Sequence, residues 1–480
     1  MNAKTKRFYF DYAIMFIIMI GAHFVPTVST ITPFGMQVLG IFVALLYGWT
    51  TQGTLLPSLI GMVALFATKS ISVTDFWAQG FGSTTVVFMV LIFIYMALVD
   101  SSGVMAFMAN WFVTRKFVSG RPWILSATLL LGCFYTAALA NPVASLMIFW
   151  GIIYRICSLM GYKPFEKWPT IMIVGVMIAS TLGWGAFPYK ILALMILGSY
   201  SSLTGTSINF GAYSLSAIVL GSLCVIGYVI VARFIYRPNV EALKNFSSDF
   251  IDKSALVLNR RQKIVFASLL IFVALVVFPS LLTNILPRFS AFMQMIDTSG
   301  LLIAVIAVLL LIRVDGEPLM DFCESARRGV LWDSVIITSI ILPIASLLMA
   351  DPTGIKNAMV AILKPILVGR GPIVFMILVI VIAAVLTNFA NNAVVGILFV
   401  SISFAMAESI GLNFPAITTL IVIVSHLALF TPAASPLAAM LFSNKEWVTS
   451  KDIMKYSAGG ILAGIVVLIV VGIPLTGFLF

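Results

Sequence analysis

Two asparagine-containing segments interrupt long apolar runs of the chain. Thr136–Pro142 reads TAALANP, and Thr387–Asn392 reads TNFANN. In hydrocarbon, each backbone N–H or C=O group freed by such a break costs several kcal/mol unless protein or a water-filled cavity satisfies it. An asparagine carboxamide offers oxygen to a cation and N–H groups to an anion, and a helix N-terminus favours negative charge. The pair predicts binding of a small anion and a cation, with interhelical hydrogen bonding as the structural alternative.

Each asparagine segment is followed by a second irregular stretch. Ser180–Lys190 reads STLGWGAFPYK, and Ser425–Pro436 reads SHLALFTPAASP. Small residues and prolines at membrane depth leave backbone carbonyl groups free to coordinate Na⁺. The alternative is that they only permit close helix packing or a kink. Because the same order occurs twice, we favour the binding interpretation.

Two ionisable side chains lie in these stretches. A lysine such as Lys190 costs about 2.5–3.5 kcal/mol or more at the bilayer centre unless it meets a partner or water. Its ammonium could pair with a substrate carboxylate or replace one Na⁺, whereas the alternative is a lysine that snorkels from a helix end. His426 could couple transport to protons, although a satisfied interhelical histidine is the simpler interpretation. Asp100 and Asp351, each shortly before a glycine, are interpreted as caps.

The elements that carry these residues are predicted from composition. The 480 residues are 61% hydrophobic and 9% charged, with a mean hydropathy of +1.13. This leaves too little polar surface for a water-soluble globule. Apolar runs that suit a ~30 Å hydrocarbon core recur from Tyr9–Val25 to Ile461–Phe478 without the alternation of barrel strands. We predict an all-α membrane protein with about 10–11 transmembrane helices plus two re-entrant hairpins, near residues 80–100 and 330–350.

The net charge of +11 comes from cations that gather between apolar runs, at Lys4–Arg7, Arg115–Arg121 and Arg233–Lys263. The positive-inside rule makes these cytoplasmic loops rather than a nucleic-acid surface. No cleavage site follows the first apolar run, so we expect a retained first helix with a cytoplasmic N-terminus. The four cysteines show no disulfide or metal spacing, and we expect no metal other than Na⁺.

An internal repeat relates the two halves. Asp100 and Asp351 are 251 residues apart (351 − 100), and Asn141 and Asn391 are 250 apart (391 − 141). Similar offsets relate two further pairs of prolines, so the chain is interpreted as a duplicated unit, with its repeats in inverted topology. The predicted parts are N-terminal scaffold helices (1–75), a first repeat (76–236), a polar linker (237–263), a second scaffold set (264–325) and the second repeat's transport elements (326–480).

These segments resemble the divalent anion:sodium symporter family, the dicarboxylate, citrate and sulfate carriers of the ion transporter superfamily. That family has a Ser-Asn-Thr motif in each inverted repeat and a small-residue, proline-containing segment downstream. Ala140-Asn141-Pro142 and Ala390-Asn391-Asn392 stand in the motif positions, and Ala433–Pro436 followed by Met440–Ser443 is similar to the Ala-Thr-Pro signature. The resemblance covers roughly residues 35–478. Both asparagines are kept, but the flanking hydroxyls are lost, which leaves the anion open.

The resemblance implies two Na⁺ sites and one substrate site at the breaks. The residues assigned to the cation sites are Asn141 and Gly183 for the first and Thr387, Ala390, Asn391 and Ala434 for the second, with Thr136 and Thr387 as sources of hydroxyl groups. The residues assigned to the substrate are Asn141, Pro142, Lys190, Asn391, Asn392 and Ser435.

The expected function is secondary transport of a small anion, di- or tricarboxylate-like or sulfate, coupled to Na⁺ rather than H⁺. The alternatives are a Na⁺-independent anion exchanger or a Na⁺/H⁺ antiporter of the same superfamily. An intramembrane enzyme is the alternative from another class, which we disfavour because no His/Asp metal cluster or Ser/Lys pair recurs at helical spacing. We expect no enzyme and no cofactor, and the absence of a Gly-x-x-x-x-Gly-Lys-Ser/Thr motif argues against ATP-driven transport. The resemblance further implies a homodimer in a bacterial inner membrane, with a transport domain that moves between its two sides.

Overall fold

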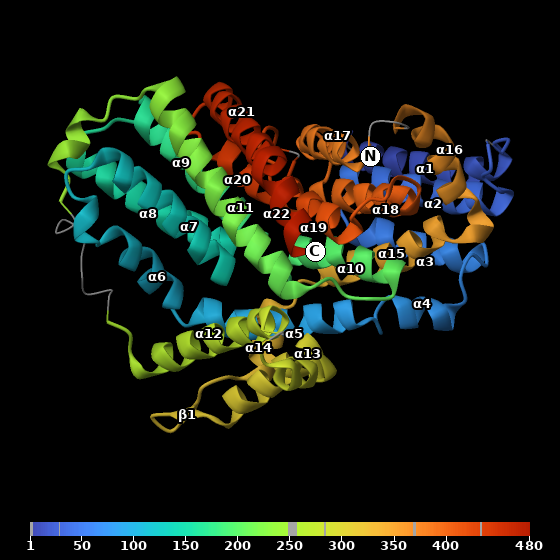
Figure 1. Ribbon diagram of the computed structural model, residues 1–480, viewed down its shortest axis with the longest axis horizontal. Coiled ribbons are helices and arrows are strands. Elements are labelled where there is room, and N and C mark those ends of the chain that lie inside the picture. Colours follow the sequence, from blue (N-terminus) through green and yellow to red (C-terminus); the bar gives the residue numbers. More distant parts are fainter. Residues whose placement is uncertain (1–2, 28, 248–256, 283–284, 368–370, 433) are drawn as a thin grey trace.

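The computed structural model describes residues 3–27, 29–247, 257–282, 285–367, 371–432 and 434–480 (Figure 1). Within these residues, ten helices are long and apolar enough to cross a membrane, or eleven if the bent pair Pro287–Met293 and Met295–Leu311 forms one span. The predicted all-α membrane fold is therefore confirmed. The re-entrant hairpins and the inverted relation of the repeats stay predictions.

In the described residues of its first half, the chain forms eleven α-helices. Their bounds are α1 Ala3–Gly21, α2 Pro33–Thr51, α3 Leu55–Ala67, α4 Val73–Gln79, α5 Thr84–Ser101, α6 Val104–Val113, α7 Pro122–Leu139, α8 Pro142–Met160, α9 Lys167–Trp184, α10 Ile191–Thr204 and α11 Phe210–Val231. Short 3₁₀ turns lie at Ala22–Phe24, Lys116–Val118 and Glu241–Asn245, and a π-turn at Ala232–Tyr236 continues α11.

The second half adds the remaining helices and one small hairpin. Their bounds are α12 Arg260–Leu281, α13 Pro287–Leu311, β1 Arg313–Val314, β2 Glu317–Pro318, α14 Phe322–Gly329, α15 Trp332–Met349, α16 Ile355–Leu367, α17 Gly371–Leu386, α18 Asn392–Ile410, α19 Phe414–Ser425, α20 Pro436–Ser443, α21 Ser450–Val467 and α22 Ile473–Leu479. A 3₁₀ turn lies at Asp351–Thr353 and a π-turn at Leu468–Gly472.

Five consecutive helices of the first half, α5 to α9, have counterparts in α15 to α19. Each counterpart starts 247 to 251 residues later, for example 250 for α8 and α18 (392 − 142). The helix order thus follows the same offset as the sequence motifs. The predicted polar linker, residues 237–263, contains one 3₁₀ turn, and its stretch 248–256 lies outside the described residues.

Helices α9 and α19 occupy the interior. Every residue of α9 from Trp168 to Gly183 is buried, and α9 packs against α7, α8, α11 and α21. Helix α19 is buried from Ala416 to Ser425 and packs against α10, α17 and α18. A helix that is apolar on all sides is buried rather than amphipathic. These two helices lead directly into the two irregular stretches, so the core itself positions the candidate site.

A second layer of the molecule is formed by α12, α13 and α14 along α5 (Figure 1). The β1–β2 hairpin turns at Asp315 and Gly316, whose φ angles of 54° and 86° are those a type I′ turn requires. Gly329, the last residue of α14, sits so close to α5 that an added Cβ would lie 2.5 Å from the Phe93 carbonyl oxygen. The end of α14 is therefore held tightly against α5.

Candidate functional site

The first helix break lies between α7 and α8. Pro142 has no N–H to donate and occupies the first position of α8, where none is needed. Asn141 caps α8: its Oδ1 accepts from Val143 N at 2.9 Å and from Ala144 N at 3.4 Å. Ala140 has extended backbone angles and leaves its carbonyl outside the helix. The break thus presents one free carbonyl beside a helix N-terminus.

Lys190 fills the space at this break. It is only 6% exposed, and its Nζ donates a hydrogen bond to the Ala140 carbonyl. The ammonium also lies 5.4 Å from the ring centroid of Tyr189, a cation–π distance. A snorkelling lysine would reach water instead. The Lys190 ammonium therefore occupies the place where a cation would neutralise the freed carbonyl.

Asp100 approaches the break from α5. Its Oδ2 accepts a hydrogen bond of 3.1 Å from Asn141 Nδ2. Its Oδ1 is buried, and it has no hydrogen-bond partner among the described residues. Asp100 therefore does not act as the helix cap that its position before a glycine suggested. It brings a negative charge beside the buried ammonium of Lys190.

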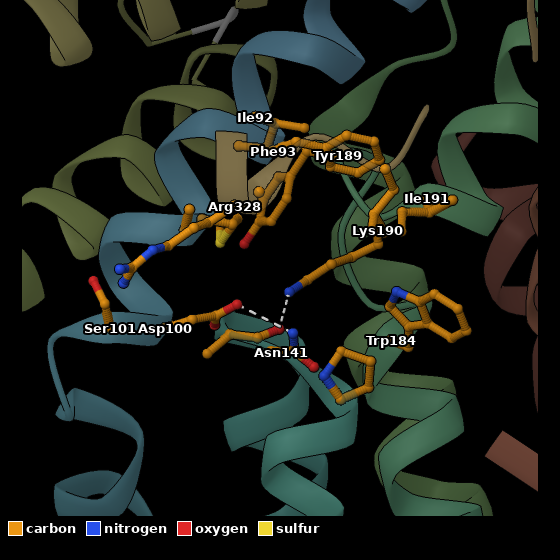
Figure 2. A pocket seen from close by; sticks show the side chains of 16 residues that line it. Ile92, Phe93, Asp100, Ser101, Asn141, Trp184, Tyr189, Lys190, Ile191 and Arg328 are labelled. Carbon is orange, nitrogen blue, oxygen red and sulfur yellow. Dashed lines mark hydrogen bonds between the residues drawn. The ribbon is translucent and has the colours of Figure 1, made fainter. Parts of the chain in front are cut away.

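These side chains line one cavity of about 450 Å³ between α5, α8, α10 and α14 (Figure 2). Asp100, Asn141 and Lys190 form its polar part, Trp184 and Tyr189 contribute aromatic walls, and Arg328 of α14 lies on the opposite side from Lys190. Two cations, an amide and a helix N-terminus favour an anion, because each can donate hydrogen bonds or positive potential to a carboxylate. The carboxylate of Asp100 weakens this preference for an anion, because it would repel a negative ligand.

The second helix break lies between α17 and α18, and Asn388 organises it. Asn388 Nδ2 donates to the Ala384 and Leu427 carbonyls at 2.7 and 2.9 Å, and its Oδ1 accepts from Leu429 N and Phe430 N, both at 2.7 Å. One buried carboxamide thus satisfies four backbone groups of α17 and of the irregular stretch after α19. Asn388 is a structural bridge.

Asn391 repeats the role of Asn141. Its Oδ1 accepts from Ala393 N at 3.0 Å and Val394 N at 3.4 Å, and so caps α18. Nearby, Thr387 Oγ1 donates to the Ser425 carbonyl at 3.4 Å. Both asparagines identified from sequence are therefore helix caps at matched breaks.

The irregular stretches of the two halves touch at Gly185. An added Cβ there would lie 2.8 Å from the His426 ring, and Trp184 makes an edge contact with the same ring. His426 Nδ1 is 2.7 Å from the Val422 carbonyl, whereas its Nε2 is buried without a partner among the described residues. Tyr213 fixes the first stretch by donating to the Gly185 carbonyl at 2.5 Å. The two irregular stretches are thus neighbours in the core.

The predicted site residues fall into two groups. Asn141, Pro142 and Lys190 line the cavity. The residues outside its lining are Thr136, Gly183, Thr387, Ala390, Asn391, Asn392, Ala434, Ser435 and, as the candidate for proton coupling, His426.

Several of the residues outside the cavity have other defined surroundings. The buried Thr136 Oγ1 has no partner among the described residues, and Gly183 packs against α7 at the Phe134 carbonyl. Ser435 caps α20 and donates to the Ala428 carbonyl at 2.9 Å. Ala434 belongs to a small buried cluster with two other alanines. The substrate residues predicted in the first half of the chain, Asn141, Pro142 and Lys190, therefore line one cavity. Those predicted in the second half lie outside it.

Sequence reasoning missed two residues that line the cavity. Asp100 stands near the end of an apolar helix, where its repeat position suggested a cap. Arg328 belongs to α14, a short helix with Glu324 and Arg327 that reads as a solvated surface. An acidic residue in the last turn of a membrane span was the available signal for Asp100, since such residues seldom lack a partner.

The fold and this arrangement define a membrane transporter. The solved structure of the YdaH transporter of Alcanivorax borkumensis, described as having an unusual topology, is similar with a TM-score of 0.59. The likeness covers 93% of this chain and 97% of that chain at 13% sequence identity, so it shows the fold alone.

The family model CitMHS, citrate transporter, matches residues 42–425, which is most of the chain. This protein therefore belongs to the citrate transporter family. The sequence matches none of the curated proteins. The expected resemblance to anion carriers is confirmed at the level of family and fold, and the chain is a carrier rather than an enzyme.

Proposed function

We propose that this protein is a secondary transporter of a citrate-type carboxylate anion, which binds in the cavity lined by Asp100, Asn141, Lys190 and Arg328. The observation that carries the proposal is the buried Lys190 ammonium beside the N-terminus of α8. A fixed cation and a helix N-terminus favour negative charge in a site of low polarity. Family membership supports a carboxylate, with sulfate as the alternative anion.

We further propose that Na⁺ drives transport and binds at the second break, near Thr387, Ala390, Asn391 and Ala434. Small residues there leave backbone carbonyls accessible to a cation. At the first break, the Lys190 ammonium takes the place of a Na⁺ by donating to the Ala140 carbonyl. We therefore expect one Na⁺ site in each chain, whereas two equivalent breaks would provide two.

Thermal unfolding of the purified protein tests both parts, because a ligand that binds the folded state raises the midpoint. Citrate, succinate, sulfate and phosphate are compared in sodium chloride and in choline chloride. We expect citrate or succinate to raise the midpoint only with Na⁺, and Lys190→Gln to abolish the rise. An equal rise in choline would remove the sodium part, and no rise with any of the four anions would contradict the anion site.

Exchange or proton coupling without Na⁺ is the second candidate, favoured by Asp100 Oδ1 and His426 Nε2, which have no hydrogen-bond partner among the described residues. Either group can bind a proton when the substrate arrives. Transport by proteoliposomes in choline, driven only by a pH gradient, distinguishes this candidate. Asp100→Asn and His426→Gln identify the group, since only the variant that removes the coupling proton should abolish uptake driven by the gradient.

For the whole protein we propose a homodimer in a cell inner membrane with a cytoplasmic N-terminus. Residues 1–75 and 264–325 would form the scaffold, and the repeat elements in 76–236 and 326–480 would move with the substrate. The contact between the two irregular stretches at Gly185 and His426 supports a common moving core, because the stretches pack directly on each other. Disulfide trapping between α3 of the scaffold and α15 of the second repeat, which pack against each other, should arrest transport without loss of substrate binding.

A further inference from the structure

We propose that Arg328 is a specificity residue that recognises a second carboxylate of the substrate, and that Glu324 holds it at the cavity mouth until such a substrate arrives. The inference rests on the proposed anion site at Lys190. It concerns a residue that belongs neither to the sequence motifs nor to the two matched breaks. Three observations carry it: the position of Arg328, its ion pair and the anchoring of α14.

Arg328 occupies the side of the cavity opposite Lys190 (Figure 2). Its side chain is 67% exposed, whereas Lys190 is buried. The Arg328 side chain extends away from Lys190 in Figure 2, so its guanidinium has to turn inward to reach an anion held at Lys190. A guanidinium binds a carboxylate through two parallel hydrogen bonds, which makes it selective for a second carboxylate at the correct distance from the first.

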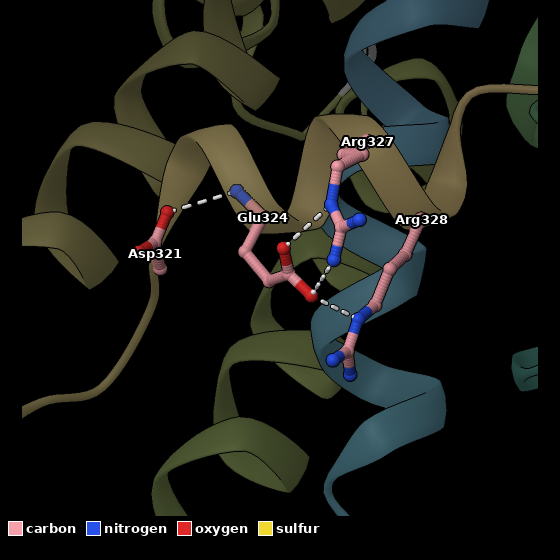
Figure 3. A network of polar contacts seen from close by, with 4 residues as sticks. All are labelled: Asp321, Glu324, Arg327 and Arg328. Atoms are coloured by element: carbon pink, nitrogen blue, oxygen red, sulfur yellow. Dashed lines mark hydrogen bonds and ion pairs between the residues drawn. The ribbon is translucent and has the colours of Figure 1, made fainter.

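The Arg328 guanidinium is already engaged within α14 (Figure 3). Its Nε pairs with Glu324 Oε1, while Arg327 Nε and Nη2 donate to the two Glu324 oxygens, each at 2.9 Å. The hydrogen bonds from Arg327 and its positive charge lower the pKa of the Glu324 carboxyl, so Glu324 stays charged near neutral pH. Exposed pairs of this kind are weak, because water screens them. A substrate carboxylate can therefore displace Glu324 from Arg328.

Arg327 keeps Glu324 neutralised when Arg328 leaves. Glu324 would otherwise be left unpaired, which would oppose the exchange. The short α14 does not need to move, because Gly329 holds it against α5 at Phe93 and Ala97, two residues that also line the cavity. Only the Arg328 side chain has to turn from Glu324 toward the cavity.

Arg327 provides a matched control for Arg328. Both are exposed arginines of one helix, both pair with Glu324, and only Arg328 lines the cavity. The probes are succinate and butyrate, which share a four-carbon chain and differ by one carboxylate. Binding of each is measured by titration calorimetry on the purified full chain, for the unmodified protein and for Arg328→Gln, Arg327→Gln and Glu324→Gln.

We expect Arg328→Gln to weaken succinate binding about tenfold, the cost of one charge-assisted hydrogen bond, and to leave butyrate binding unchanged. Arg327→Gln should change succinate binding less than about twofold, as expected for an exposed pair. Glu324→Gln should tighten succinate binding and leave butyrate unchanged, because it frees Arg328. Equal effects of Arg328→Gln and Arg327→Gln, or equal effects of Arg328→Gln on both probes, would overturn the proposal.

Lys190→Gln separates this proposal from the anion site on which it rests. If the site is correct, that variant loses both succinate and butyrate. If Lys190→Gln binds both probes normally, the proposed function fails at this cavity. If Lys190→Gln abolishes the binding of both probes, but Arg328→Gln changes succinate and butyrate binding equally, the anion site stands and only the role of Arg328 fails.

Discussion

At the residue scale, the first break shows how one side chain can serve both structure and binding. Asn141 accepts two backbone N–H groups of α8 through Oδ1 and donates to Asp100 through Nδ2. Its cap stabilises the helix, whereas its amide holds the acidic side chain of the cavity in place. The two roles use different atoms, so substitutions can separate them.

Asn141→Ala removes both roles and Asn141→Ser keeps a cap oxygen. Loss of an N-cap costs about 0.5–2 kcal/mol, so we expect Asn141→Ala to lower the free energy of unfolding by that amount and Asn141→Ser to lower it much less. Both should weaken anion binding, because neither donates to Asp100. Denaturant unfolding and calorimetry measure the two effects. Equal destabilisation by both variants would contradict the cap role.

Lys190 is predicted to act through its charge. We expect Lys190→Gln to lose anion binding although glutamine can still donate a hydrogen bond to Ala140, because the buried positive charge is gone. Lys190→Arg should keep part of the binding. Uptake by proteoliposomes and the anion-induced rise of the unfolding midpoint provide the readouts. Full anion binding by Lys190→Gln would show that the hydrogen bond, and not the charge, matters.

At the element scale, the second irregular stretch depends on Asn388 rather than on regular helix bonds. Four backbone groups find their partner in this one carboxamide. Residues 427–429 are non-helical and buried, so their N–H and C=O groups have no access to water in place of Asn388.

We predict that Asn388→Ala lowers the free energy of unfolding by about 3 kcal/mol or more, since a buried group without its partner costs about 1–3 kcal/mol. Asn388→Asp should also destabilise the protein, because its second oxygen would face the Ala384 and Leu427 carbonyls in place of the donating amide. Asn392→Ala is the control, because Asn392 is only half-buried and lies at the start of α18. Chemical unfolding distinguishes these variants, and similar losses for Asn388→Ala and Asn392→Ala would refute the bridging role.

The contact between α7 and α9 is predicted to depend on Gly183. A Cβ there would collide with the Phe134 carbonyl and lie 3.1 Å from Ala138 N, so Gly183→Ala should separate the helices and destabilise the protein by about 1–3 kcal/mol. Gly151→Ala is the control, because nothing lies within 4 Å of its added Cβ. Alanine favours a helix over glycine, so Gly151→Ala should be neutral or stabilising. Thermal unfolding of the two variants gives the comparison.

At the scale of the whole molecule, two of the three cationic segments lie together. Gly120 N donates to the Phe246 carbonyl at 3.0 Å, which joins two of the basic segments. Gln262 Nε2 donates to the Ser102 carbonyl at 3.1 Å, and Arg261 Nη2 to the Leu319 carbonyl at 2.9 Å. The cavity residue Asp100 and helix α14 therefore lie on the same side as these basic loops. The positive-inside rule predicts that this is the cytoplasmic side.

Cys323 makes that orientation testable. It is exposed on α14, whereas Cys133, Cys157 and Cys224 are buried. We expect a membrane-impermeant maleimide to label Cys323 in inverted membrane vesicles and not in intact cells, and Cys323→Ser to remove the label. Labelling in intact cells would place α14 and the cavity mouth on the outer side.

The sequence by itself determined the membrane-spanning helical fold, the two breaks and the asparagines at them. These are local properties: apolar length decides what can lie in lipid, and an asparagine followed by a new helix caps that helix whatever surrounds it. Lys190 was also recognisable, because an isolated charge in an apolar stretch is costly anywhere in the membrane.

The partners of these residues were decided only by the tertiary structure. Asp100 meets Asn141 across 41 residues of chain, and Arg328 reaches the same cavity from a helix 228 residues after Asp100 (328 − 100), because α5 packs against both α10 and α14. Such meetings depend on helix packing, which no local pattern encodes. For the same reason, Asn388 appears in the sequence as one of three similar asparagines, and only the folded core makes it the bridge.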